Sequence, residues 1–329
     1  MSKRNILVTG ATGKQGRALI RALLHSSSSA EQNYHIYALT RTASSPSAKS
    51  LRETEREENL TLVEGNLDDE ASIRKIFKDA EERGGIWGVF AVLAFPGLGV
   101  EADGEERQGK LIADLALEFG VKSFLYSSAM RAGPKYEDEL KLSGRAKANI
   151  EMHCMKLGLL GLPWTILRPS FFMENFEGFI GSISVAVMKS GLKPDTSTAL
   201  INHEKYKHKI LTLASEFSTM TQLEESHQKA LGKPIPAVPA AFGWLLVKMN
   251  KATRGLITDI EKHHYAYVAG EYPSCDSEIA LANSAYKMKT YFEWKSQERK
   301  ERKEERKEDT SGAGNWNQVS LGKLLTGRM

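Results

Sequence analysis

Short apolar runs alternate with longer amphipathic stretches along the first half of the chain. The apolar runs are continuous rather than strictly alternating, which is typical of strands that are buried on both faces. Between them, stretches such as residues 68–85 and 107–120 carry apolar residues at helical spacing. This order predicts an α/β fold in which helices cover both sides of a doubly wound parallel sheet. The predicted strands are residues 5–9, 35–40, 60–65, 88–94, 123–128 and 164–170.

The pattern changes in the second half of the chain, and we predict a domain boundary there. Helix-like segments at residues 176–189, 220–231 and 240–250 are separated by turns that contain proline or glycine, and one strand-like run lies at 208–215. We therefore predict a first domain over residues 1–175 and a smaller, mixed lobe over residues 176–295.

The last part of the chain is a highly charged tail. Every residue from 298 to 308 is charged, with five glutamates and six basic residues, so the net charge of this run is only +1. So balanced a run predicts a solvated helix or a disordered tail over residues 296–329 rather than an arm that binds nucleic acid.

Composition excludes several classes of protein. The net charge of +4 is small for 329 residues, so no broad affinity for nucleic acid is expected. The longest apolar stretch, residues 86–100, is interrupted by Pro96 and is too short to span a bilayer, and the N-terminus lacks the pattern of a secretory signal. We expect a protein of the cytoplasm, and also of the nucleus, without a membrane partner.

Cysteine and histidine give no sign of a metal site or a disulfide framework. The two cysteines, Cys154 and Cys275, are too few for such a framework and suggest a reducing compartment. The eight histidines include no pair at helical i, i+4 spacing, and His263 and His264 are adjacent, so their rings would point to different sides. We expect no bound metal.

The stretch NILVTGATGKQGRALIRAL, residues 5–23, passes from a strand into a helix through three glycines spaced three apart. In such a loop the first glycine permits a tight turn, the second lets backbone amides approach a pyrophosphate, and the third lets the helix pack on the sheet. The helix N-terminus adds unpaired N–H groups and a positive dipole end. We predict a dinucleotide phosphate site, with a plain tight turn as the alternative; its residues are Gly10, Thr12, Gly13, Lys14, Gln15 and Gly16.

The end of the second predicted strand indicates which dinucleotide binds. NAD sites usually carry Asp or Glu there, whereas this strand ends in Thr40, Arg41 and Thr42. A carboxylate would repel a 2′-phosphate, while a guanidinium can hold one through a fork of charge-assisted hydrogen bonds. We predict NADP(H) as the cofactor; the alternative is that Arg41 is an ordinary solvated arginine.

The ends of the third and fourth strands are further candidates for the cofactor site, because ligands of such sheets bind at the carboxyl ends of the strands. Asn66 and Leu67 would lie near an adenine, and Ala94 and Phe95 would pass under the ribose and pyrophosphate. At both places a simple connecting turn is the alternative.

Together with residues 147–151 (KANIE) and 166–176 (ILRPSFFMENF), these motifs resemble the NmrA-like proteins. That family is an atypical branch of the short-chain dehydrogenase/reductase superfamily, related to the isoflavone-reductase-like enzymes. The resemblance implies a Rossmann-like domain that binds NADP(H) and a small C-terminal lobe that closes over a cleft. By matching position, it also implies that the glycine loop, Arg41, Lys147, Phe171 and Asn175 line this cleft.

One departure from the superfamily concerns its Tyr-x-x-x-Lys motif, in which the lysine and the ribose lower the pKa of the tyrosine so that it can act as acid or base. Lys147 stands at the lysine position, but Ser143 occupies the position four residues before it. A serine hydroxyl cannot replace a phenol near neutral pH. Tyr136, five residues before Lys141, has the wrong spacing for one helix face.

Lys147 and the end of the fifth strand are therefore the remaining candidates for chemistry. The resemblance implies that Lys147 binds the nicotinamide ribose, and as a sole general base it would need its pKa lowered by desolvation. Glu151, four residues further on, is an alternative partner that would hold the lysine charged. Ser127 and Ser128 are candidates to orient a carbonyl group.

A second departure concerns the smaller lobe. The family usually carries an additional segment with a helix between residues 198–201 and 203–209, whereas here Asn202 joins the two sides directly. We therefore expect a lobe that is shortened near residues 201–203.

Two functions follow from the sequence. The first is an NADP(H)-binding regulatory protein that reports redox state to a protein partner, and the missing tyrosine favours it. The second is an NADPH-dependent oxidoreductase of secondary metabolism that reduces a small apolar carbonyl or enone, with Lys147 as acid or base.

Overall fold

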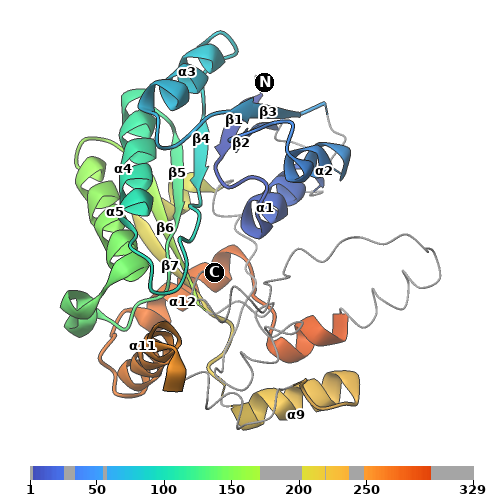
Figure 1. Cartoon of the computed structure of the whole chain (residues 1–329), viewed down its shortest axis with the longest axis vertical. Coiled ribbons are helices and arrows are strands. Elements are labelled where there is room, and N and C mark those ends of the chain that lie inside the picture. Colours follow the sequence, from blue (N-terminus) through green and yellow to red (C-terminus); the bar gives the residue numbers. More distant parts are fainter. Residues whose placement is uncertain are drawn as a thin grey trace.

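The computed structural model describes residues 3–25, 34–54, 58–170, 202–218, 220–236 and 248–297. Within these residues seven parallel strands form one sheet with the order β3-β2-β1-β4-β5-β6-β7 (Figure 1). The strands are β1 (Arg4–Val8), β2 (Tyr34–Thr40), β3 (Leu60–Glu64), β4 (Gly88–Ala91), β5 (Ser123–Ser127), β6 (Trp164–Pro169) and β7 (Lys209–Leu213).

Helices cover both faces of the sheet. One face packs against α1 (Lys14–His25), α2 (Pro46–Thr54) and α12 (Cys275–Ala285). The other face packs against α3 (Glu70–Glu81), α4 (Asp103–Glu118) and α5 (Leu142–Gly158). The remaining helices are the 3₁₀ helix η2 (Pro134–Glu139), α8 (His203–Tyr206), α9 (Met220–Leu231) and α11 (Lys251–Val268).

The continuous apolar runs are explained by these two layers of helices. In β1, Ile6 and Val8 belong to the core under α1, while Leu7 belongs to the core under α3 and α4, and all three are fully buried. Because successive side chains of a strand point to opposite faces, a strand covered on both sides needs apolar residues at every position.

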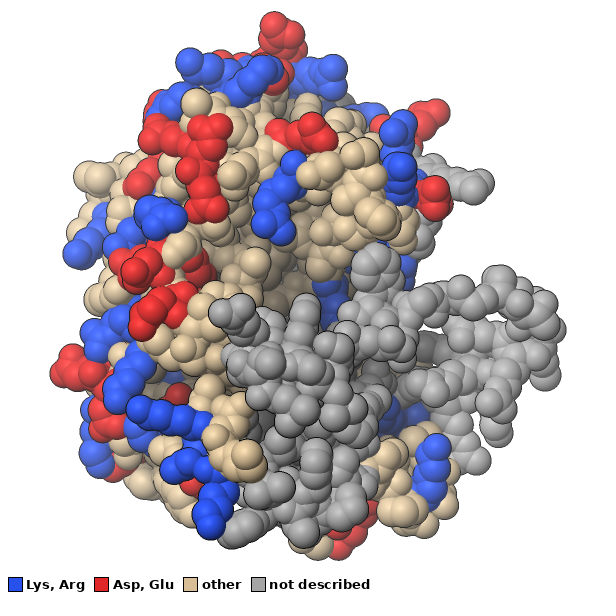
Figure 2. Space-filling view, viewed as in Figure 1, with Lys and Arg blue, Asp and Glu red and all other residues tan. Residues whose placement is uncertain are grey.

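The surface of the described part of the chain carries both signs of charge. Acidic and basic side chains are interspersed on the face seen in Figure 2. Some of them join neighbouring helices: the Arg74 guanidinium of α3 binds Glu118 of α4 and also Glu70 one turn earlier. No helix in the described part of the chain is long and apolar enough to cross a membrane.

The six strands predicted in the first half are confirmed, with bounds that differ by a few residues at most. One expectation is wrong. The run at residues 208–215 was expected in the smaller lobe, but as β7 it pairs with β6 at the edge of the main sheet, with Leu211 opposite Leu167. Its apolar residues Leu211 and Leu213 are buried in the core of the sheet, which explains the placement.

The described part of the C-terminal region is otherwise helical, and the predicted helix at residues 220–231 is confirmed as α9. The expected helix at 176–189, most of that at 240–250 and the charged run lie outside the described residues. The domain boundaries and the shortened lobe stay predictions.

Candidate functional site

The glycine loop after β1 has a backbone that excludes larger side chains at two of its three glycines. Gly10 has a φ of +55°, and a Cβ there would lie 2.9 Å from both the Cγ1 and the carbonyl oxygen of Val92. A Cβ on Gly16 would lie 2.4 Å from the carbonyl oxygen of Gly10. The sequence-based reasons for a tight turn at Gly10 and close packing at Gly16 are therefore met.

The middle glycine is different, and this difference bears on whether a dinucleotide fits. A Cβ on Gly13 would contact only the carbonyl oxygen of Gly10, at 3.2 Å, and Gly13 itself is exposed. The side of the loop that would face a pyrophosphate is thus open, and it lies at the N-terminus of α1, where backbone N–H groups have no helical acceptor. The loop fits the phosphates of a dinucleotide.

The other predicted cofactor residues follow the carboxyl ends of the neighbouring strands, and parallel pairing brings these ends to one edge of the sheet. Arg41 follows β2, Asn66 and Leu67 follow β3, and Ala94 and Phe95 follow β4. The side chain of Phe95 is 56% exposed. The structure therefore brings together on this edge all of the predicted cofactor residues up to Phe95.

Arg41 is exposed and makes no hydrogen bond or ion pair with another described residue. A carboxylate lies close to its loop, because Glu64, at the end of β3, stands opposite Thr40 in the sheet. Glu64 accepts a hydrogen bond of 2.6 Å from the backbone N–H of Ala43. This carboxylate anchors the loop after β2 and leaves the guanidinium of Arg41 open to a ligand.

The glycine loop is linked to the end of β5. The hydroxyl of Ser127 donates a hydrogen bond of 2.7 Å to Oε1 of Gln15. The neighbouring hydroxyl of Ser128 donates instead to Glu151 of α5. Both serines are buried, so their hydroxyls are already committed to protein groups and do not stand free for a substrate carbonyl.

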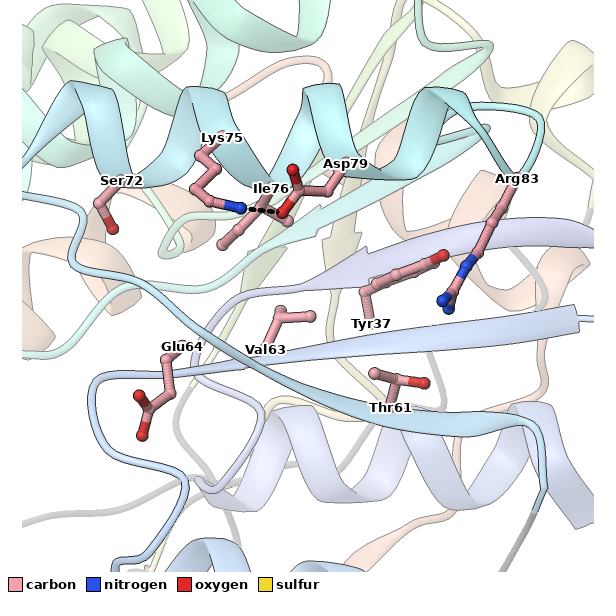
Figure 3. Close-up of a pocket in the computed structure, with 9 residues that line it drawn as sticks. All are labelled: Tyr37, Thr61, Val63, Glu64, Ser72, Lys75, Ile76, Asp79 and Arg83. Atoms are coloured by element: carbon pink, nitrogen blue, oxygen red, sulfur yellow. Dashed lines mark hydrogen bonds and ion pairs between the residues drawn. The ribbon is translucent and has the colours of Figure 1, made fainter.

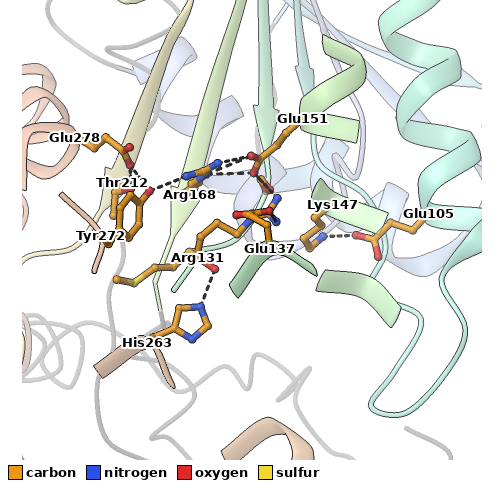
Figure 4. Close-up of polar contacts among 12 residues, drawn as sticks. Glu105, Arg131, Glu137, Lys147, Glu151, Arg168, Thr212, His263, Tyr272 and Glu278 are labelled. Atoms are coloured by element: carbon orange, nitrogen blue, oxygen red, sulfur yellow. Dashed lines mark hydrogen bonds and ion pairs between the residues drawn. The ribbon is translucent and has the colours of Figure 1, made fainter. Parts of the chain in front are cut away.

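Three polar residues of α5, Ser143, Lys147 and Glu151, are spaced four apart and so share one face of that helix. The first two bind the same carboxylate. The ammonium group of Lys147 forms an ion pair with Glu105 in the first turn of α4 (Figure 4). Ser143 donates to the other oxygen of Glu105 at 2.6 Å. The side chain of Glu105 is 1% exposed.

Glu151 was expected as an alternative partner of Lys147, and that expectation is wrong. The carboxylate of Glu151 binds Arg168 of β6 through Nη2 at 2.6 Å, and Nη2 of Arg131 lies 3.0 Å from its other oxygen. This last contact is an ion pair whose N–H is not directed at the oxygen. Glu151 lies one turn further along α5, beyond the start of α4 and next to the ends of β5 and β6, which explains the exchange of partners.

The same group of residues extends into the C-terminal helices. Nη1 of Arg168 donates to the hydroxyl of Tyr272 at 2.6 Å, and that hydroxyl donates to Glu278 of α12, also at 2.6 Å (Figure 4). Thr212 of β7 donates to the same oxygen of Glu278. We call these residues, Glu151, Arg131, Arg168, Tyr272 and Glu278, the arginine network; it joins α5 and the sheet to α12.

Electrostatics distinguish the groups of this site. Burial alone would raise the pKa of Glu151, but the charges of Arg131 and Arg168 lower it below its ordinary value. Burial and then the charges of Glu105 and Glu151 raise the pKa of Tyr126, on β5, well above its ordinary value. The lowered tyrosine pKa that acid–base catalysis requires in this superfamily is thus not found at Tyr126.

Tyr136, the other tyrosine considered from the sequence, lies in η2 and is turned toward the C-terminal helices. Its hydroxyl donates to Glu271 at 2.7 Å, and this hydrogen bond raises its pKa. Burial likewise raises the pKa of the Cys154 thiol. Within the described residues no three His, Cys, Asp or Glu side chains are grouped to hold a metal ion.

Sequence reasoning missed Glu105 and the two arginines. Glu105 is one of several acidic residues in the first turn of an amphipathic helix, where acids are common because of the helix dipole, so it gave no signal. Arg168 did give one, since it is a charged residue inside the apolar run of β6 and such a residue needs a buried partner. The predicted cofactor residues Phe171 and Asn175 lie outside the described residues.

Comparison with known proteins adds a family and two relatives. Residues 2–199 match the model of the NmrA-like family. The chain is 25% identical over 274 residues to the NmrA-like family domain-containing oxidoreductase cpsB of Aspergillus campestris, covering 73% of this chain and 76% of that protein. It is 27% identical over 186 residues to the similarly described ptmS of Penicillium ochrochloron, covering 53% and 49% of the two chains.

Solved structures show the same fold. The negative transcriptional regulator Nmra in complex with NADP superposes with a TM-score of 0.62 at 18% identity, over 94% of this chain and 99% of that one. The NADPH-dependent quinone oxidoreductase QOR2 from Escherichia coli, with NADPH bound, gives 0.58 at 19% identity over 89% and 99%. These likenesses confirm the predicted Rossmann-like fold.

Proposed function

The chain belongs to the NmrA-like family, and from that premise we propose that it binds NADP(H) and acts as a redox-sensing regulatory protein with little or no catalysis. The resemblance stated from the sequence is thereby confirmed at the level of the family. Relatives point in both directions, because one of the similar solved structures is a transcriptional regulator and both curated relatives are described as oxidoreductases.

The glycine loop and Arg41 support NADP(H) as the cofactor. The open side of Gly13 and the N-terminus of α1 would hold the pyrophosphate. The guanidinium of Arg41, which pairs with no described residue, would hold the 2′-phosphate. The carboxylate of Glu64 accepts from the N–H of Ala43 and forms no ion pair with Arg41, so it does not neutralise the guanidinium. Solved relatives carry NAD or NADP in the regulator and NADPH in the quinone oxidoreductase.

Cofactor choice can be tested by calorimetry with Arg41→Ala. The variant should bind NADP(H) more weakly by ~1.5–3 kcal/mol, the value of a hydrogen bond to a charged group, and should bind NAD(H) almost as the wild type does. Arg52→Ala, a basic residue in the last turn of α2, serves as the matched control. Equal losses for the two cofactors would rule out a role of Arg41 in selecting the phosphate.

The observation that supports a regulatory function is that Glu105 binds the residues at both positions of the Tyr-x-x-x-Lys motif. Ser143 and Lys147 stand where the superfamily has its proton-transferring pair, and both donate to one buried carboxylate. The hydroxyls of Ser127 and Ser128 are also committed, and the pKa values of Tyr126 and Tyr136 are raised. Each hydroxyl and ammonium group of Ser127, Ser128, Ser143 and Lys147 is thus engaged by another protein group, which favours a protein that binds the cofactor without turnover.

The arginine network offers a physical route from the cofactor to a partner surface. Gln15 of the glycine loop accepts from Ser127, and the adjacent Ser128 donates to Glu151, which is bound to Arg168 and through it to Tyr272 and α12. A cofactor that shifts Gln15 would act on β5 and through it on the network. The protein partner would then read the disposition of the C-terminal helices.

The second candidate function is an NADPH-dependent oxidoreductase of a small apolar carbonyl or enone, and the descriptions of the two curated relatives favour it. The bound nicotinamide would supply the hydride. Lys147 would then have to leave Glu105 or share its ammonium group with the substrate oxygen, since it is the only motif residue able to donate a proton there.

Turnover decides between the two functions. We expect wild-type protein to bind NADPH and to show no oxidation of it that depends on a panel of carbonyl and enone compounds, while Lys147→Ala weakens binding modestly. If NADPH is consumed with a substrate and Lys147→Ala lowers that rate by about 10²–10⁴-fold with little change in binding, the protein is an enzyme.

A further inference from the structure

A pocket away from the glycine loop lies between α3 and the sheet, over β2 and β3. It has a volume of about 290 Å³, at the lower end of the range for small-molecule sites. Figure 3 shows its lining, which comes from both strands, from α3 and from the turn after it. The lining residues are Tyr37, Thr61, Val63, Glu64, Ser72, Lys75, Ile76, Asp79 and Arg83.

One end of this pocket carries a buried hydroxyl with no partner. Tyr37 is 5% exposed, and its hydroxyl makes no hydrogen bond with any described residue. The hydroxyl of Thr61, which also lines the pocket, already has a hydrogen-bond partner, because its Oγ1 lies 2.9 Å from Nε2 of His35. A buried polar group left unpaired costs free energy, so Tyr37 is a residue that a ligand atom would satisfy.

The same end carries an open positive charge. The guanidinium of Arg83 makes no hydrogen bond or ion pair with another described residue, and in Figure 3 it is turned toward the hydroxyl of Tyr37. Lys75, further along the pocket, is already ion-paired with Asp79. The positive charge of Arg83 reaches this part of the sheet, since after burial and Lys3 it lowers the pKa of His35.

The floor next to these two polar groups is apolar. Val63 of β3 and the buried Ile76 of α3 line it. Thr61 lies near the start of β3 and Glu64 at its end, so the end with Tyr37 and Arg83 points away from the carboxyl edge where the glycine loop lies. The pocket adjoins the dinucleotide site at Glu64, but its end with Tyr37 and Arg83 is separate from that site.

We propose that this pocket binds a small organic acid, whose carboxylate accepts hydrogen bonds from Arg83 and from the Tyr37 hydroxyl and whose apolar body lies on Val63 and Ile76. A guanidinium offers a carboxylate two parallel N–H donors, and a phenol adds one O–H donor. An apolar body displaces water from the floor, which an inorganic anion would leave wet.

The proposal is tested by calorimetric titration of the full chain, saturated with NADP⁺, with benzoate, phenylacetate and octanoate. At least one acid should bind, and its uncharged counterpart (benzyl alcohol, 2-phenylethanol or octanol) should bind at least tenfold more weakly. Tyr37→Phe, which keeps the ring, and Arg83→Gln should each weaken the acid at least tenfold, which is the worth of a hydrogen bond to a charged group.

Lys78→Gln is the matched control, because Lys78 is an exposed cation of α3, the helix that precedes Arg83, and does not line the pocket. It should leave the affinity unchanged, and circular dichroism should show all three variants folded. Failure of all three acids to bind would overturn the proposal. Equal binding to wild type and Arg83→Gln, or competition between the acid and NADP⁺, would also overturn it, whatever the outcome for the proposed function.

Discussion

Two buried glutamates next to the cofactor edge hold their cations in different ways. The side chains of Glu105 on α4 and Glu151 on α5 are 1% and 3% exposed, and each accepts a hydrogen bond from a serine. Among the described residues Glu105 has one cationic partner, Lys147, whose side chain is 16% exposed. Glu151 has two arginines whose side chains are 3% and 11% exposed.

The difference indicates different roles. An ammonium group on a flexible stem can leave its partner and reach solvent or a ligand, whereas a planar guanidinium in a buried fork is held in place. We infer that the contact of Lys147 with Glu105 can change when a cofactor binds. The arginine network, by contrast, holds α5, β6 and α12 in a fixed arrangement.

The largest expected effect comes from removing the charge of Glu151. Glu151→Gln keeps the shape of the side chain but removes the carboxylate that binds the buried Arg168 and leaves Arg131 only the more exposed Glu137, 3.3 Å away, so the free energy of unfolding should fall by about 3–5 kcal/mol. Urea denaturation measures this change. Glu118→Gln, at an exposed ion pair, is the control and should have a much smaller effect. If Glu151→Gln lowers the free energy of unfolding no more than the control does, the arginine network does not hold these elements together.

A smaller coupling is expected at Glu105. In a double-mutant cycle of Glu105→Gln and Lys147→Met, the interaction energy should lie between about 0.5 and 3 kcal/mol, since the lysine can turn to solvent when its partner is lost. The cycle is run by urea denaturation with and without NADPH. The comparison predicts a coupling that changes with cofactor; a coupling that is identical in both conditions would place Lys147 in a fixed role like that of Arg168.

The pH dependence of stability should come from Glu151. Its pKa in the folded protein is lowered below the ordinary value of 4.5, so its contribution is fully present above that pH and is lost as the pH falls through the folded pKa. Each unit by which the pKa is lowered contributes about 1.4 kcal/mol. The free energy of unfolding should therefore fall less steeply below pH 4.5 in Glu151→Gln than in wild type; identical slopes would assign the acid sensitivity to other carboxylates.

The smallest effect is expected where the network reaches α12. Tyr272→Phe removes a hydroxyl that accepts from Arg168 and donates to Glu278, and it should cost about 0.5–1.5 kcal/mol. Hydrogen exchange of the α12 amides is the sharper measurement, because faster exchange there and unchanged exchange in α5 would locate the loss. Tyr267→Phe, whose hydroxyl donates to the exposed Asp276, is the matched control.

The strands of the sheet and the glycine loop could be predicted from the sequence because the pattern of neighbouring residues determines them. The strand runs and the three glycines carry their own periodicity and spacing, and the positions of Arg41, Asn66 and Phe95 follow from the parallel order of the strands. The strand β7 was predicted at the correct residues but was expected in the smaller lobe instead of the main sheet. Its pattern shows a buried strand but not which sheet edge it joins, and that edge lies more than forty residues earlier, at Thr165 and its neighbours.

Partners of charged side chains were harder to predict. Glu151 has the correct helical spacing to pair with Lys147. Which carboxylate binds the lysine depends, however, on where α4 begins relative to α5. Lys147 binds Glu105, which is 42 positions away along the chain but adjacent in the folded protein. The pair Tyr37 and Arg83 is likewise brought together by the packing of α3 on β2. No spacing along the chain encodes such contacts.

The strand order has a consequence for how the chain is made. The first strand, β1, lies inside the sheet between β2 and β4, and Thr9 both donates to and accepts from the backbone of Val92, 83 positions later. At about 5–20 residues per second, a ribosome needs about 4–17 s to synthesise the chain between them. During that time one edge of β1, which carries the apolar residues Ile6, Leu7 and Val8, has no native neighbour. Until Val92 has been synthesised, the nascent chain is thus exposed to mispairing at this edge of β1.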